Sequence, residues 1–157
     1  MVSKPANLIN LLNSGKLKRH VPTVTELETH LREGNNGLAD AVLPGISDTG
    51  RFKNVYDAAH AFSMVAFKTL GYRPDDKQGH RQILFTALEH AVPATERDHG
   101  LFENANRTRN LLEYDGSFMM SEMEMEELIR ATRNLQEEVA LLYRNWKKAQ
   151  ADSQSRS

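Results

Sequence analysis

The sequence contains no cysteine, and its positive and negative charges nearly balance. Without cysteine, the chain can form neither disulfides nor thiolate metal sites. Lysine and arginine together number 20 against 21 aspartates and glutamates, which gives a formal net charge of -1. This balance argues against a protein that wraps nucleic acid through a broad basic surface. A local basic site remains compatible with it.

Long apolar runs are also missing. No stretch reaches the roughly 20 apolar residues that a membrane-spanning helix needs. The apolar patch within residues 1–17 is interrupted by asparagine and serine, and it is too short and too polar for a signal peptide. We therefore expect a cytoplasmic protein without a membrane segment.

What the sequence does contain is helical periodicity. Apolar residues recur at three- and four-residue steps in segments near 6–13, 23–42, 52–70, 79–92 and 121–149, and in a helix that carries residues 106–116. The segment 52–70 is apolar around most of its circumference, as a central helix should be. Gly34 and Gly37 predict a kink or break in the second segment.

Local signals mark where several of these helices begin. Thr23 with Glu26, Thr95 with Asp98 and Ser121 with Glu124 have the spacing of helix caps. Residues 44–50 are typical of a loop, and no segment shows the alternation of a strand. We predict an all-α, up-and-down bundle of four principal helices plus a short N-terminal helix. It forms one domain over residues 1–149, followed by a disordered tail over residues 150–157.

The stretch NRTRNLLEYDG, residues 106–116, crowds polar side chains onto a helix. At about 100° per residue, the core stripe of this helix consists of Leu101, Ala105, Thr108 and Leu112. One flank of the helix, beside this stripe, then carries Asn106, Arg109 and Glu113. Asn110 lies between that flank and the side of the helix opposite the core.

Two interpretations of this flank are open. Arg109 and Glu113 can form an ordinary ion pair four residues apart, which contributes a few tenths of a kcal/mol. Alternatively, Arg109 and Asn110 bind an anion, because a guanidinium offers a planar fork that matches phosphate oxygens.

Four pieces of sequence carry a resemblance to a known family. They are RFKNVYDAAHAF (residues 51–62), LGYRP (70–74), GHRQILFTALE (79–89) and RTRNLLEYDG (107–116), followed by the capped last helix. Their order resembles small stand-alone prokaryotic proteins of the HEPN family (higher eukaryotes and prokaryotes nucleotide-binding). The resemblance extends over roughly residues 6–145.

In ribonucleases of that family, an arginine and a polar residue precede a histidine by four to six positions. The resemblance implies that this pair works across a dimer cleft without a metal, with arginine stabilising charge and histidine moving protons. Arg109-Asn110 matches the first half of the motif, but the histidine window holds Tyr114, Asp115 and Gly116. Tyrosine, with a reference pKa near 10 against about 6.5 for histidine, is a poor proton acceptor at neutral pH. The departure favours binding over catalysis.

The sequence thus predicts a phosphate- or nucleotide-binding cluster, with catalytic residues left unassigned. Its members are Arg109, Asn110, Tyr114, Arg107, Asn106, Glu113 and His80. His80 lies at a predicted helix start, where it either supplies the missing proton carrier or only caps the helix. The six histidines lack the spacing of a metal site, and we predict no metal and no cofactor.

We therefore expect a HEPN-like module that binds a nucleotide or RNA phosphate and forms a homodimer. Two alternatives stay open. One is a protein-interaction component of a toxin–antitoxin or nucleotidyltransferase system, which would bind a protein partner. The other is an active, metal-independent endoribonuclease.

Overall fold

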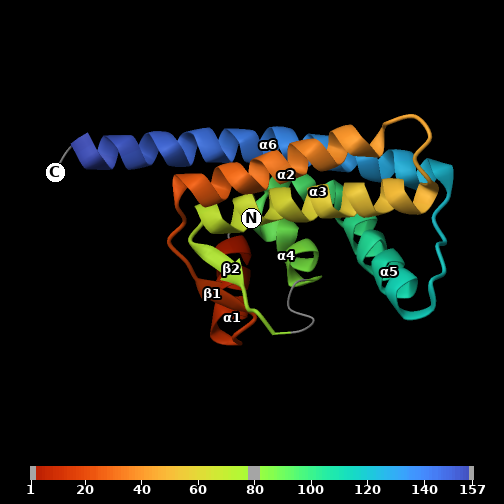
Figure 1. Cartoon of the computed structure of the whole chain (residues 1–157). Helices are drawn as coiled ribbons and strands as arrows, with labels where there is room; N and C mark the ends of the chain where they lie inside the picture. Colours follow the sequence, from red (N-terminus) through yellow and green to blue (C-terminus); the bar gives the residue numbers. More distant parts are fainter. Residues whose placement is uncertain (1–2, 78–81, 156–157) are drawn as a thin grey trace.

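The computed structural model describes residues 3–77 and 82–155, which form a helical bundle with one small two-stranded sheet (Figure 1). The elements are α1 (Ser3–Asn13), β1 (Leu17–Arg19), α2 (Val24–Ala41), α3 (Asp48–Thr69), β2 (Tyr72–Pro74), α4 (Ile83–Ala91), the 3-10 segment η2 (Pro93–Asp98), α5 (His99–Asp115) and α6 (Glu122–Ser155). The prediction of an all-α bundle is confirmed. Four helices are long, α2, α3, α5 and α6, and α4 is a separate short helix of 9 residues.

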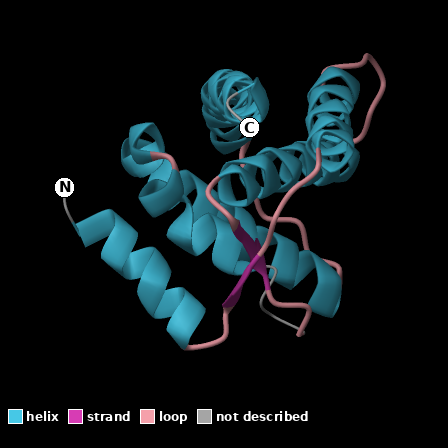
Figure 2. Ribbon diagram, turned by 90° about the vertical axis from the view of Figure 1, so that its left-hand side faces the viewer, coloured by secondary structure: helices cyan, strands magenta, loops and turns pink. Residues whose placement is uncertain are grey.

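Helix α3 is the central helix of the bundle. It packs against α2, α4 and α6. Figure 1 shows α2 and α6 running beside it, and Figure 2 shows the same bundle turned by 90°. Phe52, Phe62 and Phe67 on α3 are fully buried, and alanines fill much of the space between its large side chains. A helix that is apolar on nearly all sides can only be stable inside a core, so the sequence composition accounts for this position.

Helix α2 is continuous through Gly34 and Gly37, so the predicted kink or break there is wrong. A Cβ atom at Gly34 would lie 2.3 Å from Cε1 of Phe62, and one at Gly37 would lie 2.8 Å from the backbone oxygen of Asn54. The two glycines therefore let α2 approach α3 closely. Packing against α3 outweighs the low helix propensity of glycine.

Two three-residue strands form a ribbon that the sequence does not reveal. β1 pairs with β2 in antiparallel fashion, with Leu17 opposite Pro74 and Arg19 opposite Tyr72. The backbone N–H of His20 also donates to the carbonyl of Gly71 at 2.8 Å. Because each strand is only three residues long, neither is long enough to show an alternating pattern. The ribbon joins the segment before α2 to the segment after α3.

Two of the three predicted helix caps are confirmed. The Thr23 side chain accepts from the backbone of Glu26 in a reciprocal capping box, and Ser121 with Glu124 makes the same pair of bonds. A further cap, Ser47, starts α3 at Asp48, inside the segment predicted as a loop.

The predicted cap at Thr95 and Asp98 is wrong. The Thr95 hydroxyl donates to the carbonyl of Val92, the residue before η2, and Asp98 makes no side-chain cap bond to α5. The buried Asp98 carboxylate instead accepts from Arg130 of α6 at 3.1 Å. Asp98, which the local pattern assigned to a helix cap, thus pairs with an arginine that lies far away in the sequence.

Helix α6 has 34 residues and continues to Ser155, across residues 150–155 for which the sequence predicts disorder. These last residues are exposed, so backbone hydrogen bonds rather than packing continue the helix there. Figure 1 shows this end of α6 extending beyond the other helices. Among the described residues, no helix combines the length and the apolar character that crossing a membrane would require.

The close approach of α2 and α3 yields a stability prediction. Gly34→Ala should lower the free energy of unfolding by about 1–3 kcal/mol, because the buried Phe62 ring must move to admit the new methyl group. Gly100→Ala on α5 is the matched control, since a Cβ atom there meets nothing within 4 Å. Urea denaturation of both variants checks this. A Gly34→Ala variant as stable as Gly100→Ala would contradict the close packing.

Candidate functional site

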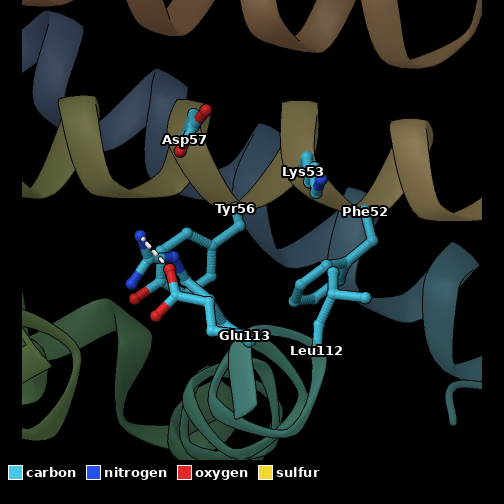
Figure 3. A pocket seen from close by; sticks show the side chains of 7 residues that line it. Phe52, Lys53, Tyr56, Asp57, Leu112 and Glu113 are labelled. Carbon is cyan, nitrogen blue, oxygen red and sulfur yellow. Dashed lines mark ion pairs between the residues drawn. The ribbon is translucent and has the colours of Figure 1, made fainter. Parts of the chain in front are cut away.

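A cavity of about 270 Å³ lies between α3 and α5 (Figure 3). Its lining residues are Phe52, Lys53, Tyr56 and Asp57 from α3 and Arg109, Leu112 and Glu113 from α5. The Phe52 and Tyr56 rings point from α3 toward α5, whereas Lys53 and Asp57 are exposed (Figure 3). The cavity therefore has an aromatic floor and a rim with both signs of charge.

Arg109 contacts both Tyr56 and Glu113 in this cavity. Its Cζ atom lies 5.0 Å from the centroid of the Tyr56 ring, within the range of a cation–π interaction. Its guanidinium is also 2.8 Å from the Glu113 carboxylate, so the predicted ion pair is present. The Arg109 and Glu113 side chains keep 24% and 57% of their exposure, and such pairs contribute only about 0–1 kcal/mol. The ion pair is therefore easily exchanged for another anion.

Asn106 and Asn110 connect helices. The buried Tyr56 hydroxyl donates to Asn106 Oδ1 at 3.1 Å, and the Asn106 amide donates to the Gln82 carbonyl at 3.3 Å. The side-chain amides of Asn110 and Gln82 bond to each other in both directions. Because Gln82 immediately precedes α4, this network fastens the start of α4 to α5 and α3.

Two other predicted members of the cluster, Arg107 and Tyr114, lie apart from the cavity. Arg107 is exposed on α5 and Tyr114 keeps 91% of its exposure, and neither lines the cavity. His80 lies outside the described residues, as do Gly79 and Arg81. The structure therefore brings Arg109 and Glu113 together in the cavity and directs Asn106 and Asn110 toward α4.

The buried face of α5 is rotated from the predicted stripe. Ala105 and Thr108 are buried as predicted, but Leu101 and Leu112 are only half-buried. Phe102 and Asn106 are buried in their place. The rotation has a physical cause, because Tyr56 and Gln82 supply hydrogen bonds that satisfy Asn106 in the interior.

All four α3 residues that line this cavity were missing from the predicted site: Phe52, Lys53, Tyr56 and Asp57. Lys53, Asp57 and His60 follow one another at steps of four and three along α3. Such spacing places them in one stripe on a single face. That polar stripe is the signal that could have identified this side of the cavity.

A group of titratable residues lies beside this region, between α2 and α3. The largely buried Lys68 ammonium is 3.0 Å from the Glu26 carboxylate and donates to Nε2 of His30 at 3.0 Å. Burial raises the pKa of the Glu26 carboxyl, but hydrogen bonds from His20 and Lys68 and from the backbone outweigh burial and lower it to about 2. Burial, and then the charge of Lys68, lower the pKa of His30. His30 is therefore a neutral imidazole near pH 7.

Within residues 3–77 and 82–155, no three His, Asp or Glu side chains converge as a metal site would require. Comparisons of the chain with protein-family models, with curated proteins and with solved structures find no match. The resemblance to HEPN proteins therefore rests on the sequence motifs.

The Tyr56–Asn106 hydrogen bond can be tested by a double-mutant cycle. Asn106→Ala should lower the free energy of unfolding by about 1–3 kcal/mol, because it leaves the buried Tyr56 hydroxyl without its acceptor. Tyr56→Phe should have a smaller effect, and the double variant should be less destabilised than the sum of the single variants. Urea unfolding measures all three. Strict additivity would show that the bond contributes nothing.

The Glu26 carboxylate should make stability depend on pH. Its folded-state pKa, about 2, lies below the usual value of 4.5, so the stabilisation is fully present above pH 4.5 and disappears as the pH falls toward 2. Glu26→Gln should therefore lower the free energy of unfolding at pH 7 by about 1–3 kcal/mol. The difference in the free energy of unfolding between this variant and wild type should disappear as the pH falls toward 2.

Urea unfolding between pH 7 and pH 2 measures this gap. Glu137→Gln, at an exposed position on α6, is the control, and it should change stability by less than about 0.5 kcal/mol. A Glu26→Gln deficit that stays constant down to pH 2 would contradict the ionic origin of the stabilisation.

Proposed function

We propose that this chain is a HEPN-like helical module that binds the phosphate of a nucleotide or of RNA, with Arg109 as the anion-binding residue. The observation that carries the proposal is the position of the Arg109 guanidinium. It lies over the Tyr56 ring in an open cavity whose rim also bears Lys53. An arginine held by an aromatic ring is ordered before its ligand arrives, which reduces the entropy lost on binding.

The charges in the cavity suit an exchange of anions. Lys53 and Arg109 supply two positive charges, and Asp57 and Glu113 supply two negative ones. A guanidinium has five N–H donors in a planar fork, and the ion pair with Glu113 engages one of its nitrogens. A phosphate can replace the Glu113 carboxylate on this fork and make two parallel hydrogen bonds in its place. Glu113 then acts as an internal competitor of the ligand.

The asparagines have a supporting role in this proposal. Asn106 accepts a hydrogen bond from the Tyr56 hydroxyl, and so it helps to orient the ring beneath Arg109. Asn110 holds the start of α4 beside α5. The Arg-Asn pair of the motif is thus divided between binding and positioning.

Binding measurements on four proteins test the proposal. Isothermal titration of wild type with inorganic phosphate, AMP and a short single-stranded RNA should give affinities that drop about 10- to 100-fold in Arg109→Ala, as expected when hydrogen bonds to a charged group are lost. Arg109→Lys should recover only part of the loss, because lysine lacks the fork. Glu113→Gln should bind phosphate several-fold more tightly, because the competing charge is gone.

Arg107→Ala is the matched control, because it removes the same charge from an exposed position on the same helix. It should bind like wild type. If Arg107→Ala and Arg109→Ala weaken phosphate binding equally, the effect comes only from the change in net charge. Undiminished binding in Arg109→Ala would refute the proposal. RNA cleavage in EDTA that depends on Arg109 would instead favour the ribonuclease, and co-purification with a protein independent of Arg109 would favour the interaction role.

A further inference from the structure

A second cavity, of about 510 Å³, adjoins the first one. Asp57 and Arg109 line both cavities, so these two side chains stand at their junction. The second cavity is bordered by His30 and Glu33 from α2 and by His60 and Met64 from α3. Lys53, Asp57, His60 and Met64 therefore form one stripe of α3 that runs from the first cavity into the second. A volume of this size lies within the range of small-molecule sites, roughly 300–1,000 Å³.

The two cavities differ in charge. The first has two cations and two carboxylates, whereas the second has Arg109 at its edge and the carboxylates of Glu33 and Asp57. His30 adds no positive charge, because an ammonium has no acceptor and Lys68 must therefore donate to a bare Nε2. A phosphate is thus better accommodated in the first cavity. The second favours groups that donate hydrogen bonds, such as sugar hydroxyls and exocyclic amines.

We infer that the second cavity receives the sugar and base of a ribonucleotide whose phosphate lies against Arg109 in the first. This inference rests on the proposed function and specifies its ligand. Asp57, at the junction, accepts hydrogen bonds from the ribose hydroxyls. A carboxylate has about four acceptor positions, so it can accept a hydroxyl in addition to its contacts within the protein.

The far part of the second cavity suits a nucleobase. Met64 is half-buried and presents a thioether, which makes favourable contacts with aromatic rings. The His60 ring lies edge-on to Phe85 at a centroid distance of 6.4 Å, so its orientation is constrained by the core. The base thus meets an apolar side chain and an ordered imidazole, while the sugar stays beside Asp57.

Titration with inorganic phosphate, ribose 5-phosphate, AMP and 2′,3′-dideoxy-AMP tests the inference. Wild type should bind AMP about 10-fold or more tightly than phosphate, with ribose 5-phosphate between them. Asp57→Asn should abolish most of the preference for AMP over its dideoxy analogue and leave phosphate affinity undiminished. Met64→Ala should weaken AMP several-fold without changing phosphate binding, and Met64→Leu should retain most of the AMP affinity.

Two controls match these variants: Asp40→Asn on α2 and Met123→Ala on α6, both at exposed positions outside the two cavities. Both should bind all four ligands like wild type. Thermal melting verifies that every variant is folded.

The outcomes separate the two proposals. Suppose that Arg109→Ala weakens phosphate binding, but that AMP binds no more tightly than phosphate and that Asp57→Asn and Met64→Ala leave AMP affinity unchanged. The second cavity is then not a nucleoside site, and this inference is overturned. If neither phosphate nor AMP responds to Arg109→Ala, the proposed function fails and the inference fails with it. Loss of AMP affinity in the Asp57 and Met64 variants, with phosphate affinity retained, supports both.

Discussion

Helix α3 is enclosed by α2, α4 and α6, and this enclosure determines where a polar site can exist. Glycines in α2 let that helix approach to within contact of Phe62, which leaves no room for a side chain at Gly34 or Gly37. Lys68 of α3 is paired with Glu26 and His30 of α2. Lys53 and Asp57, at the start of the polar stripe of α3, are exposed instead. Both cavities open along this stripe. The packing of the helices around α3 thus defines where the two cavities lie on the surface.

The buried polar groups of α5 help to maintain the shape of the first cavity. Asn106 satisfies the Tyr56 hydroxyl inside the core, and it is in turn bonded to the segment that precedes α4. A buried network in which each member has a partner stiffens the structure, whereas one unsatisfied member would weaken it. Tyr56 thereby supports Arg109 from below with its ring while its hydroxyl is held by the interior. Stability and the proposed anion binding therefore depend on the same side chain.

Much of the fold could be predicted from the sequence because its signals are local. Helical periodicity and the capping boxes at Thr23 and Ser121 depend on residues three or four positions apart, and the structure confirms them. The cap at Thr95 and Asp98 failed because Arg130, 32 residues further on, pairs with the Asp98 carboxylate. Gly34 was misinterpreted for the same reason, since its role is set by Phe62 on another helix. Likewise, the sequence pointed to Arg109 and Glu113, but the opposite wall of the cavity comes from α3, about 50 residues earlier in the chain.

The small ribbon has a consequence for the register of the helices. β1 precedes α2 and β2 follows α3, so the ladder between Leu17–Arg19 and Tyr72–Pro74 closes the hairpin of the two helices at its open end. If α3 slid along α2 by one turn, about 5.4 Å, these hydrogen bonds would break. Such a slide would also carry Lys53, Asp57 and His60 past Arg109. The hydrogen bonds between these two short strands thus fix the position of α3 along α2.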